Sequence, residues 1–110
     1  MTLVDLVEVC TLSEVPDGEG IKITIEGLPA LAVYRVGEEV FVSDDLCTHG
    51  DASLSEGELD IEDYVIECPF HQGGFDIRTG SVAGAPCTRP IRVYEAWIKN
   101  GLVYIKKQDL

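Results

Sequence analysis

Two short elements of this sequence place histidine beside cysteine. The first reads Cys47-Thr48-His49, and the second reads Cys68-Pro69-Phe70-His71. The chain has only two histidines, and both lie within three residues of a cysteine. A loop with Cys and His two or three positions apart can turn both side chains toward one metal site, as nearby glycine and proline permit. We therefore interpret Cys47, His49, Cys68 and His71 as the ligands of one metal centre.

The ligand set leaves two kinds of metal centre open. Two thiolates and two imidazoles would suit zinc, although structural zinc fingers usually pair Cys with Cys in one element and His with His in the other. Here each element is mixed, which favours a two-iron cluster whose first iron binds both thiolates and whose second binds both imidazoles. Such a site is neutral when oxidised and gains one negative charge on reduction. A zinc-stabilised interaction module remains the alternative.

The other two cysteines have no metal-ligand spacing. Two disulfides would require an oxidising, secreted context, and the sequence shows no secretory signal. Cys10 lies on a strand-like pattern, and Cys87 has no partner at a ligand spacing. We interpret both as structural thiols.

The elements that must position these ligands are predicted to be short strands, which makes the fold class all-β. Turn residues separate the strands at Pro16-Asp17-Gly18, Gly37 and Arg78-Thr79-Gly80, and Asn100-Gly101 suits a two-residue type I′ hairpin. One helical turn is expected at Leu12 to Val15. The predicted strands are Leu6 to Cys10, Ile21 to Glu26, Leu31 to Val36, Val40 to Ser43, Tyr64 to Glu67, Phe75 to Ile77, Ile91 to Lys99 and Leu102 to Lys106.

The length of 110 residues predicts a single domain, residues 1–110, with one modest core. The middle of the chain, about residues 46–90, differs from its flanks because it holds both histidines, three cysteines and many glycines. We interpret it as an inserted subdomain that carries the chemistry. The acidic segment 54–63 is expected to be a solvated loop beside it.

The formal net charge of −12 limits the partners of the chain. Nucleic acids and anionic lipid surfaces attract basic proteins, so neither is expected as a partner. The sequence also lacks an apolar run of the roughly 18 to 20 residues that span a bilayer. We expect a cytoplasmic monomer whose partners present basic surfaces.

The two elements, C-x-H and then C-x-x-H, resemble the motif of the Rieske family. The resemblance extends to Thr48, Gly50 and Pro69, to the stretch Gly73-Gly74-Phe75-Asp76, and to the loop Ala85-Pro86-Cys87. It implies a small antiparallel β-sandwich with an inserted cluster-binding subdomain formed by two loops. It also implies one [2Fe–2S] cluster, with Cys47 and Cys68 on the inner iron and His49 and His71 on the outer, solvent-facing iron.

Departures from the family pattern bear on the reduction potential. The high-potential branch of the family adds a disulfide between the two loops, where this chain has Ala52 and Phe70. That branch also places serine and tyrosine hydroxyls near the sulfurs, where this chain has Gly73 and Phe75. Without these donors the reduced state is less stabilised, so we expect a potential near the low end of the Rieske range of about −150 to +300 mV.

The sequence leaves no residues for a second catalytic centre. Both histidines are already used, and no G-x-G-x-x-G fingerprint for a flavin or nicotinamide cofactor follows a strand. The chain is therefore expected to be an electron carrier and not an enzyme. It most resembles the ferredoxins that pass electrons from an NAD(P)H-dependent flavin reductase to a terminal aromatic-ring dioxygenase.

Partners are expected to dock at the His49/His71 tip. The residues expected around that tip are Gly50, Asp51, Gln72, Gly73 and Pro86. The small Rieske-like subunit of an assimilatory nitrite reductase is the alternative within the same fold.

Overall fold

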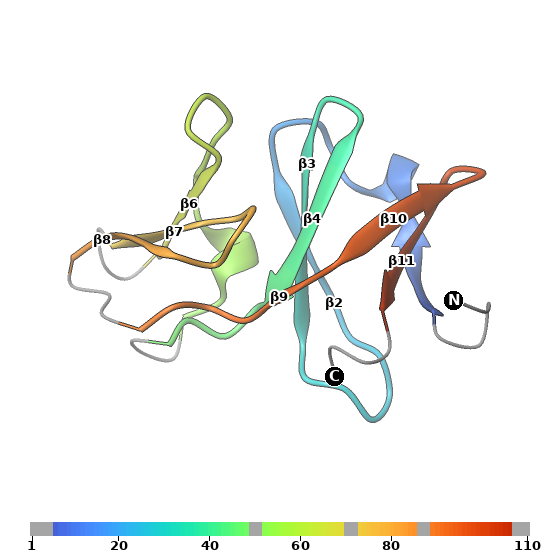
Figure 1. The fold of residues 1–110 in the computed structure, drawn as a ribbon, viewed down its shortest axis with the longest axis horizontal. Helices are drawn as coiled ribbons and strands as arrows, with labels where there is room; N and C mark the ends of the chain where they lie inside the picture. Colours follow the sequence, from blue (N-terminus) through green and yellow to red (C-terminus); the bar gives the residue numbers. More distant parts are fainter. Residues whose placement is uncertain (1–5, 49–51, 70–72, 86–88, 107–110) are drawn as a thin grey trace.

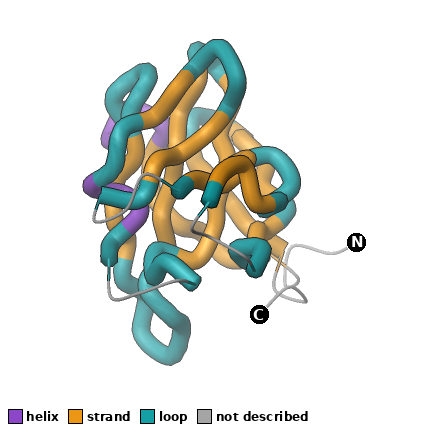
Figure 2. The backbone as a smooth tube through the Cα atoms, turned by 90° about the vertical axis from the view of Figure 1, so that its left-hand side faces the viewer, coloured by secondary structure: helices purple, strands orange, loops and turns teal. Residues whose placement is uncertain are grey.

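The computed structural model describes residues 6–48, 52–69, 73–85 and 89–106. These residues form three antiparallel sheets joined by turns, with helical structure limited to short 3₁₀ turns (Figures 1 and 2). The first sheet has the order β1-β11-β10, the second β2-β3-β4-β9 and the third β5-β6-β7-β8. The predicted all-β antiparallel fold is confirmed.

The strands and short helical turns have the following bounds: β1 Leu6–Thr11, η2 Leu12–Glu14, β2 Gly20–Ile23, β3 Leu31–Val36, β4 Glu39–Asp44, η3 Leu54–Glu56, β5 Leu59–Asp60, β6 Val65–Glu67, β7 Gly74–Asp76, β8 Val82–Gly84, β9 Val93–Tyr94, β10 Ala96–Lys99 and β11 Leu102–Lys106.

Strand β3 joins the two hydrophobic cores of the molecule. Successive side chains of a strand point to opposite faces. Leu31 and Val33 pack in one core with Val103 of β11, and we call the two sheets around that core the base. Ala32 and Tyr34 pack in the other core, and all four of these β3 side chains have no exposed surface. Because one strand supplies both cores, the base and the third sheet are packed against each other.

The third sheet belongs to an insertion between β4 and β9. We call residues 45–92 the lobe. Strands β4 and β9 pair directly, with Val42 opposite Tyr94 and Ser43 opposite Val93. The lobe therefore leaves the base and returns to it at neighbouring strands (Figure 1). Among the described residues, its core holds ten buried ones: Ala32, Tyr34, Cys47, Ala52, Leu54, Ile66, Cys68, Phe75, Ile77 and Ile91.

Most strand predictions are confirmed, and the errors lie in the lobe and in the segment that follows it. Strands β3 and β11 have the predicted bounds, whereas the predicted strand Ile91 to Lys99 is two strands, β9 and β10. The segment 54–63 was expected to be a solvated loop, but it contains η3 and β5, and Leu54 and Ser55 are buried. The two edge strands of the third sheet, β5 and β8, were not predicted. They are only two and three residues long.

The hairpin between β10 and β11 agrees with the sequence. Asn100 and Gly101 both adopt positive φ, 53° and 76°, as a type I′ turn requires. The single helical turn expected after β1 is η2. Among the residues described, no helical segment has the length and apolar character needed to cross a bilayer.

Candidate metal centre

Cys47 and Cys68 lie in one buried layer of the lobe. Cys47 comes shortly after β4, and Cys68 directly follows β6. Each side chain is only 3% exposed, and both belong to the lobe core. The fold thus brings together two cysteines that are far apart in sequence, as the ligand prediction requires.

The remaining expected ligands, His49 and His71, lie outside the described residues. So do Gly50, Asp51, Phe70, Gln72, Pro86 and Cys87 from the sequence predictions.

Each of the two cysteine loops is closed by a backbone hydrogen bond of the same kind. The Cys47 amide donates to the carbonyl of Ala52 at 3.0 Å, and the Cys68 amide donates to the carbonyl of Gly73 at 2.8 Å. In each loop the bond joins a residue to the fifth residue after it, and the histidine lies between them. We call residues 47–52 and 68–73 the first and second cysteine loops. The two loops are therefore closed in the same way.

Strand pairing holds the base of the second cysteine loop. Glu67 of β6 lies opposite Gly74 of β7, so the loop is a hairpin connection. Gly74 has no room for a side chain, because a Cβ there would lie 2.8 Å from the Ile66 carbonyl oxygen. This close approach brings the ends of the loop together directly below Cys68.

The first cysteine loop is fixed at its base by Asp45 and from the side by Arg89. The Leu54 amide donates to the Asp45 carbonyl at 2.7 Å, and the Asp45 side chain accepts hydrogen bonds from Ser53 and Ser55. The Thr48 hydroxyl donates to the Arg89 carbonyl at 2.9 Å, and the Arg89 guanidinium donates to the Thr48 carbonyl at 3.1 Å. Sequence reasoning missed these contacts, since partners up to 41 residues apart leave no local pattern.

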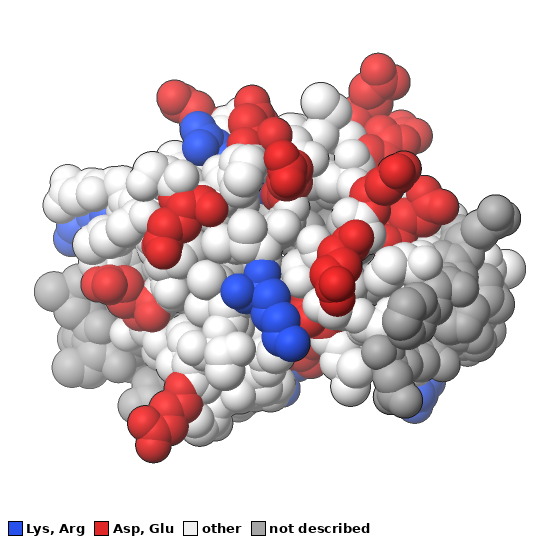
Figure 3. Space-filling model, turned by 180° about the vertical axis from the view of Figure 1, so that it is seen from behind, with Lys and Arg blue, Asp and Glu red and all other residues white. Residues whose placement is uncertain are grey.

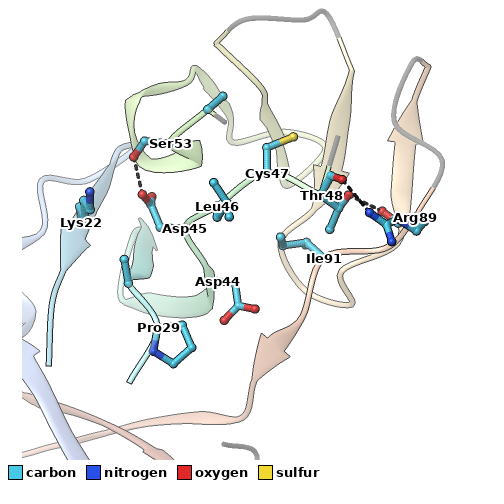
Figure 4. Close-up of a pocket in the computed structure, with 12 residues that line it drawn as sticks. Lys22, Pro29, Asp44, Asp45, Leu46, Cys47, Thr48, Ser53, Arg89 and Ile91 are labelled. Atoms are coloured by element: carbon cyan, nitrogen blue, oxygen red, sulfur yellow. Dashed lines mark hydrogen bonds between the residues drawn. The ribbon is translucent and has the colours of Figure 1, made fainter. Parts of the chain in front are cut away.

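A hollow of about 710 Å³ opens beside the first cysteine loop (Figure 4). In this view the Cys47 sulfur points away from Asp44 and Pro29 on the opposite wall. Leu46, which is 60% exposed, lies between them. The residues that line the hollow are Lys22, Pro29, Ala30, Asp44, Asp45, Leu46, Cys47, Thr48, Ala52, Ser53, Arg89 and Ile91.

Two neighbours of the cysteines in the lobe core are apolar. Phe75 of β7 and Ala52 pack in the same core, with 0% and 1% of their surfaces exposed. Neither can donate a side-chain hydrogen bond to a sulfur. Two buried cysteines supplied by two matched loops can provide soft thiolate ligands, which suit an iron–sulfur cluster. The residues present therefore fit such a group, with the thiolates shielded from water.

Cys10 lies elsewhere, on β1 in the core of the base. Burial, and after it the nearby Glu14 carboxylate, raise the pKa of this thiol to about 11. A thiol with so high a pKa is protonated at neutral pH and is a poor nucleophile and metal ligand. This placement agrees with the interpretation of Cys10 as a structural residue.

The fold and the paired cysteine loops define a class of small β proteins built around one metal centre. Residues 5–95 match the Rieske [2Fe-2S] domain family. The chain is also 48% identical over 98 residues to Ferredoxin CarAc of Metapseudomonas resinovorans, covering 89% of this chain and 90% of that one. The chain belongs to the Rieske [2Fe-2S] family.

Two further likenesses extend over nearly whole chains. The ferredoxin component of the p-cumate 2,3-dioxygenase system of Pseudomonas putida is 42% identical, over 94% of this chain and 86% of that one. A solved complex of reduced oxygenase and oxidised ferredoxin in carbazole 1,9a-dioxygenase contains a chain of the same fold. Its TM-score is 0.84 at 47% identity, with 94% of each chain covered.

Membership of the Rieske family decides between the iron–sulfur cluster and zinc as the metal centre. A Rieske domain holds one [2Fe–2S] cluster, so the zinc-stabilised alternative is set aside. The expected cofactor is confirmed.

Proposed function

We propose that this chain is the ferredoxin component of an aromatic-ring dioxygenase system. It carries one electron at a time from an NAD(P)H-dependent flavin reductase to a terminal Rieske non-haem iron oxygenase, and is itself no enzyme. The observation that carries this proposal is the near full-length match to ferredoxin components, at 48% and 42% identity. These relatives serve different dioxygenases, so the match supports the role of the chain and leaves the aromatic substrate open.

We further propose Cys47 and Cys68 as ligands of the inner iron, and His49 and His71 as ligands of the outer iron. When bound, the cluster takes up and releases one electron. The chain supplies the two thiolates from matched loops, buries them, and surrounds them with Ala52 and other apolar side chains. Burial of the inner half leaves the histidine side as the short path for the electron.

Partners are proposed to dock at the His49/His71 tip as a transient complex with this chain as a monomer. Acidic side chains are spread over the face seen in Figure 3, with few basic ones among them. A net charge of −12 would attract basic partner surfaces over long range. The solved ferredoxin–oxygenase complex supports a direct encounter of this kind.

We also propose the cytoplasm as the location. A reductase that consumes NAD(P)H must work where that cofactor is kept reduced. Fractionation of the native host, followed by detection of the chain with an antibody, tests this location.

Ligand assignment is tested by single substitutions read out in the visible absorption and EPR spectra. We expect His71→Ala and Cys68→Ser to abolish the native cluster spectrum. Cys10→Ser is the matched control, because it removes a buried cysteine from the base and should leave the spectrum unchanged. A native spectrum in His71→Ala would remove that residue from the ligand set.

Electron transfer is tested with the reductase and terminal oxygenase of a carbazole 1,9a-dioxygenase system. We expect NADH and the reductase to bleach the oxidised chain by one electron, and the oxygenase to reoxidise it. Failure of either step in the presence of a native spectrum would contradict the proposed role. Co-purification with a large partner at high salt would instead favour the accessory subunit of a nitrite reductase.

A further inference from the structure

One acidic side chain is buried in the described part of this acidic protein. Asp45 is 2% exposed, and no other Asp or Glu among the described residues falls in the buried class. A buried carboxylate is costly unless it is well hydrogen-bonded, so its position calls for an explanation. It lies two residues before Cys47, at the start of the first cysteine loop.

Both oxygens of the Asp45 side chain accept hydrogen bonds. One oxygen, Oδ1, accepts the Ser55 amide at 2.9 Å, and Oδ2 accepts the Ser53 hydroxyl (Figure 4). The Ser55 hydroxyl lies 3.0 Å from the Ser53 hydroxyl, so it can donate to Ser53 in turn. Both oxygens are therefore acceptors, and each accepts from a neutral donor.

No cation neutralises this charge in the part of the chain that the structure describes. The ion pairs found there are Arg78–Asp76 and Lys106–Glu95, and neither includes Asp45. Lys22 lines the same hollow but forms no ion pair with Asp45 within the described residues. The negative charge is held by neutral donors, so its field extends into the lobe.

Two observations place this charge beside the proposed inner ligand. Asp45 and Cys47 line the same hollow, and two residues of extended chain span at most about 7 Å. The hydroxyl of Tyr34 is within electrostatic reach of both. Burial raises the pKa of Tyr34, the Ser43 hydrogen bond lowers it, and the charges of Asp45 and Cys47 raise it further.

We propose that the buried charge of Asp45 lowers the reduction potential of the cluster, an inference that rests on the proposed function and its ligand assignment. Reduction adds one negative charge at the site, and a fixed negative charge nearby opposes it. With an effective dielectric constant of about 20 and a separation on the order of 10 Å, the repulsion lowers the equilibrium constant for reduction by about tenfold. This corresponds to about 59 mV for a one-electron couple.

The test is protein-film voltammetry of Asp45→Asn beside the native chain. Asparagine has nearly the same shape and can keep both contacts, since its oxygen accepts the Ser55 amide and its nitrogen can donate to Ser53. We expect the potential to rise by an amount equal to about a tenfold larger reduction constant. A potential that is unchanged in a normally loaded Asp45→Asn protein would overturn the proposal.

Two control variants separate charge from loop structure. Ser53→Ala removes one hydrogen bond but keeps the carboxylate, and should stay close to the native potential. Glu56→Gln removes an exposed charge on η3 and should shift the potential much less than Asp45→Asn. A rise in Ser53→Ala as large as that in Asp45→Asn would show that loop distortion is the cause, which would also overturn the proposal.

Cluster loading is checked first, with iron and sulfide content and visible circular dichroism. If Asp45→Asn and the second neutral variant Asp45→Ser both fail to load while Asp45→Glu loads, Asp45 is a structural residue and the electrostatic proposal is wrong. The readout is the difference in reduction potential between variants, which does not depend on which partners the chain serves. Failure of electron transfer to the oxygenase would contradict the proposed function and leave these differences intact.

Discussion

Phe75 occupies the position at which a hydroxyl would most directly alter the site. Its side chain has no exposed surface and packs in the core that contains both cysteines. We expect Phe75→Tyr to raise the reduction potential, because a hydroxyl that donates to a sulfur stabilises the reduced, more negative state. The expected rise is on the order of one tenfold step in the reduction constant, or about 59 mV.

Voltammetry of the loaded protein checks this expectation. Phe41→Tyr is the matched control, since Phe41 is a half-buried ring on β4 whose edge packs against Tyr64. Equal potentials in the native chain and in Phe75→Tyr would mean that the ring directs its hydroxyl away from the sulfurs.

The sequence predicts four ligands, but it could not predict the contacts that support their loops. Cys47, His49, Cys68 and His71 stand out because a mixed spacing of Cys and His is a local pattern. The hydrogen bonds that Asp45 accepts, and those between Thr48 and Arg89, depend on which segments the fold brings together. Until the fold is known, Asp45 is one of 20 acidic residues in a strongly acidic chain.

At the scale of elements, Gly57 joins η3 to the second cysteine loop. A Cβ at this position would lie 1.8 Å from the carbonyl oxygen of Glu67, the residue before Cys68. We expect Gly57→Ala to lower the free energy of unfolding by about 1–3 kcal/mol or more, because the backbone of β6 must move. Thermal unfolding followed by circular dichroism measures the loss.

Gly27→Ala is the control for this substitution. Gly27 has a positive φ of 84° but nothing within 4 Å of its would-be Cβ, so only the backbone cost of about 1 kcal/mol is expected. Similar losses of unfolding free energy in Gly57→Ala and Gly27→Ala would contradict the close approach of Gly57 to the Glu67 carbonyl.

The turn between β7 and β8 should give a pH-dependent contribution to stability. Hydrogen bonds from the Arg78 guanidinium, at 2.8 and 3.1 Å, hold the pKa of Asp76 below its ordinary value of 3.8. A lowered folded-state pKa stabilises the folded chain above pH 3.8, and this stabilisation is lost as the pH falls below that value.

We therefore expect Asp76→Asn to melt below the native chain at pH 7, with the gap closing as the pH falls below 3.8. Melting curves of the two proteins across this range test the sign, and comparing them at each pH removes effects common to both. A gap that widens in acid would contradict the lowered pKa.

Strand boundaries show where sequence patterns stop being informative. The run Ile91 to Lys99 has the composition of one strand, yet β9 pairs with β4 and β10 pairs with β11. The chain crosses from one sheet to the other at Glu95, whose carbonyl accepts the Lys106 amide at 3.1 Å. The composition of the run cannot reveal this crossing, because the partner strand of each half is decided by the fold.

At the scale of the whole molecule, the net charge of −12 should control association with partners. We expect the second-order rate of reduction by the reductase to fall as salt rises. Glu58→Lys with Glu67→Lys reverses two exposed charges on the lobe beside Cys68, and should slow the reaction further. Glu8→Lys with Glu26→Lys makes the same change in net charge on the base.

Stopped-flow reduction over a range of salt concentrations distinguishes local from overall charge. If the lobe variant and the base variant are slowed equally, only net charge matters and the acidic surface of the lobe is no docking determinant. Greater slowing of the lobe variant would locate the encounter on the lobe, and greater slowing of the base variant would contradict docking there.

The pairing of β4 with β9 bears on how the protein acquires and loses iron. Strands β4 and β9 of the base pair with each other at the point where the lobe begins and ends. The base core contains neither Cys47 nor Cys68. The base can therefore keep its packing while the lobe opens. Biosynthetic insertion of the cluster then needs only a local opening of a chain anchored at both ends. For the same reason, the release of iron to a chelator should be faster than global unfolding, and the emptied chain should accept a new cluster without refolding from the beginning.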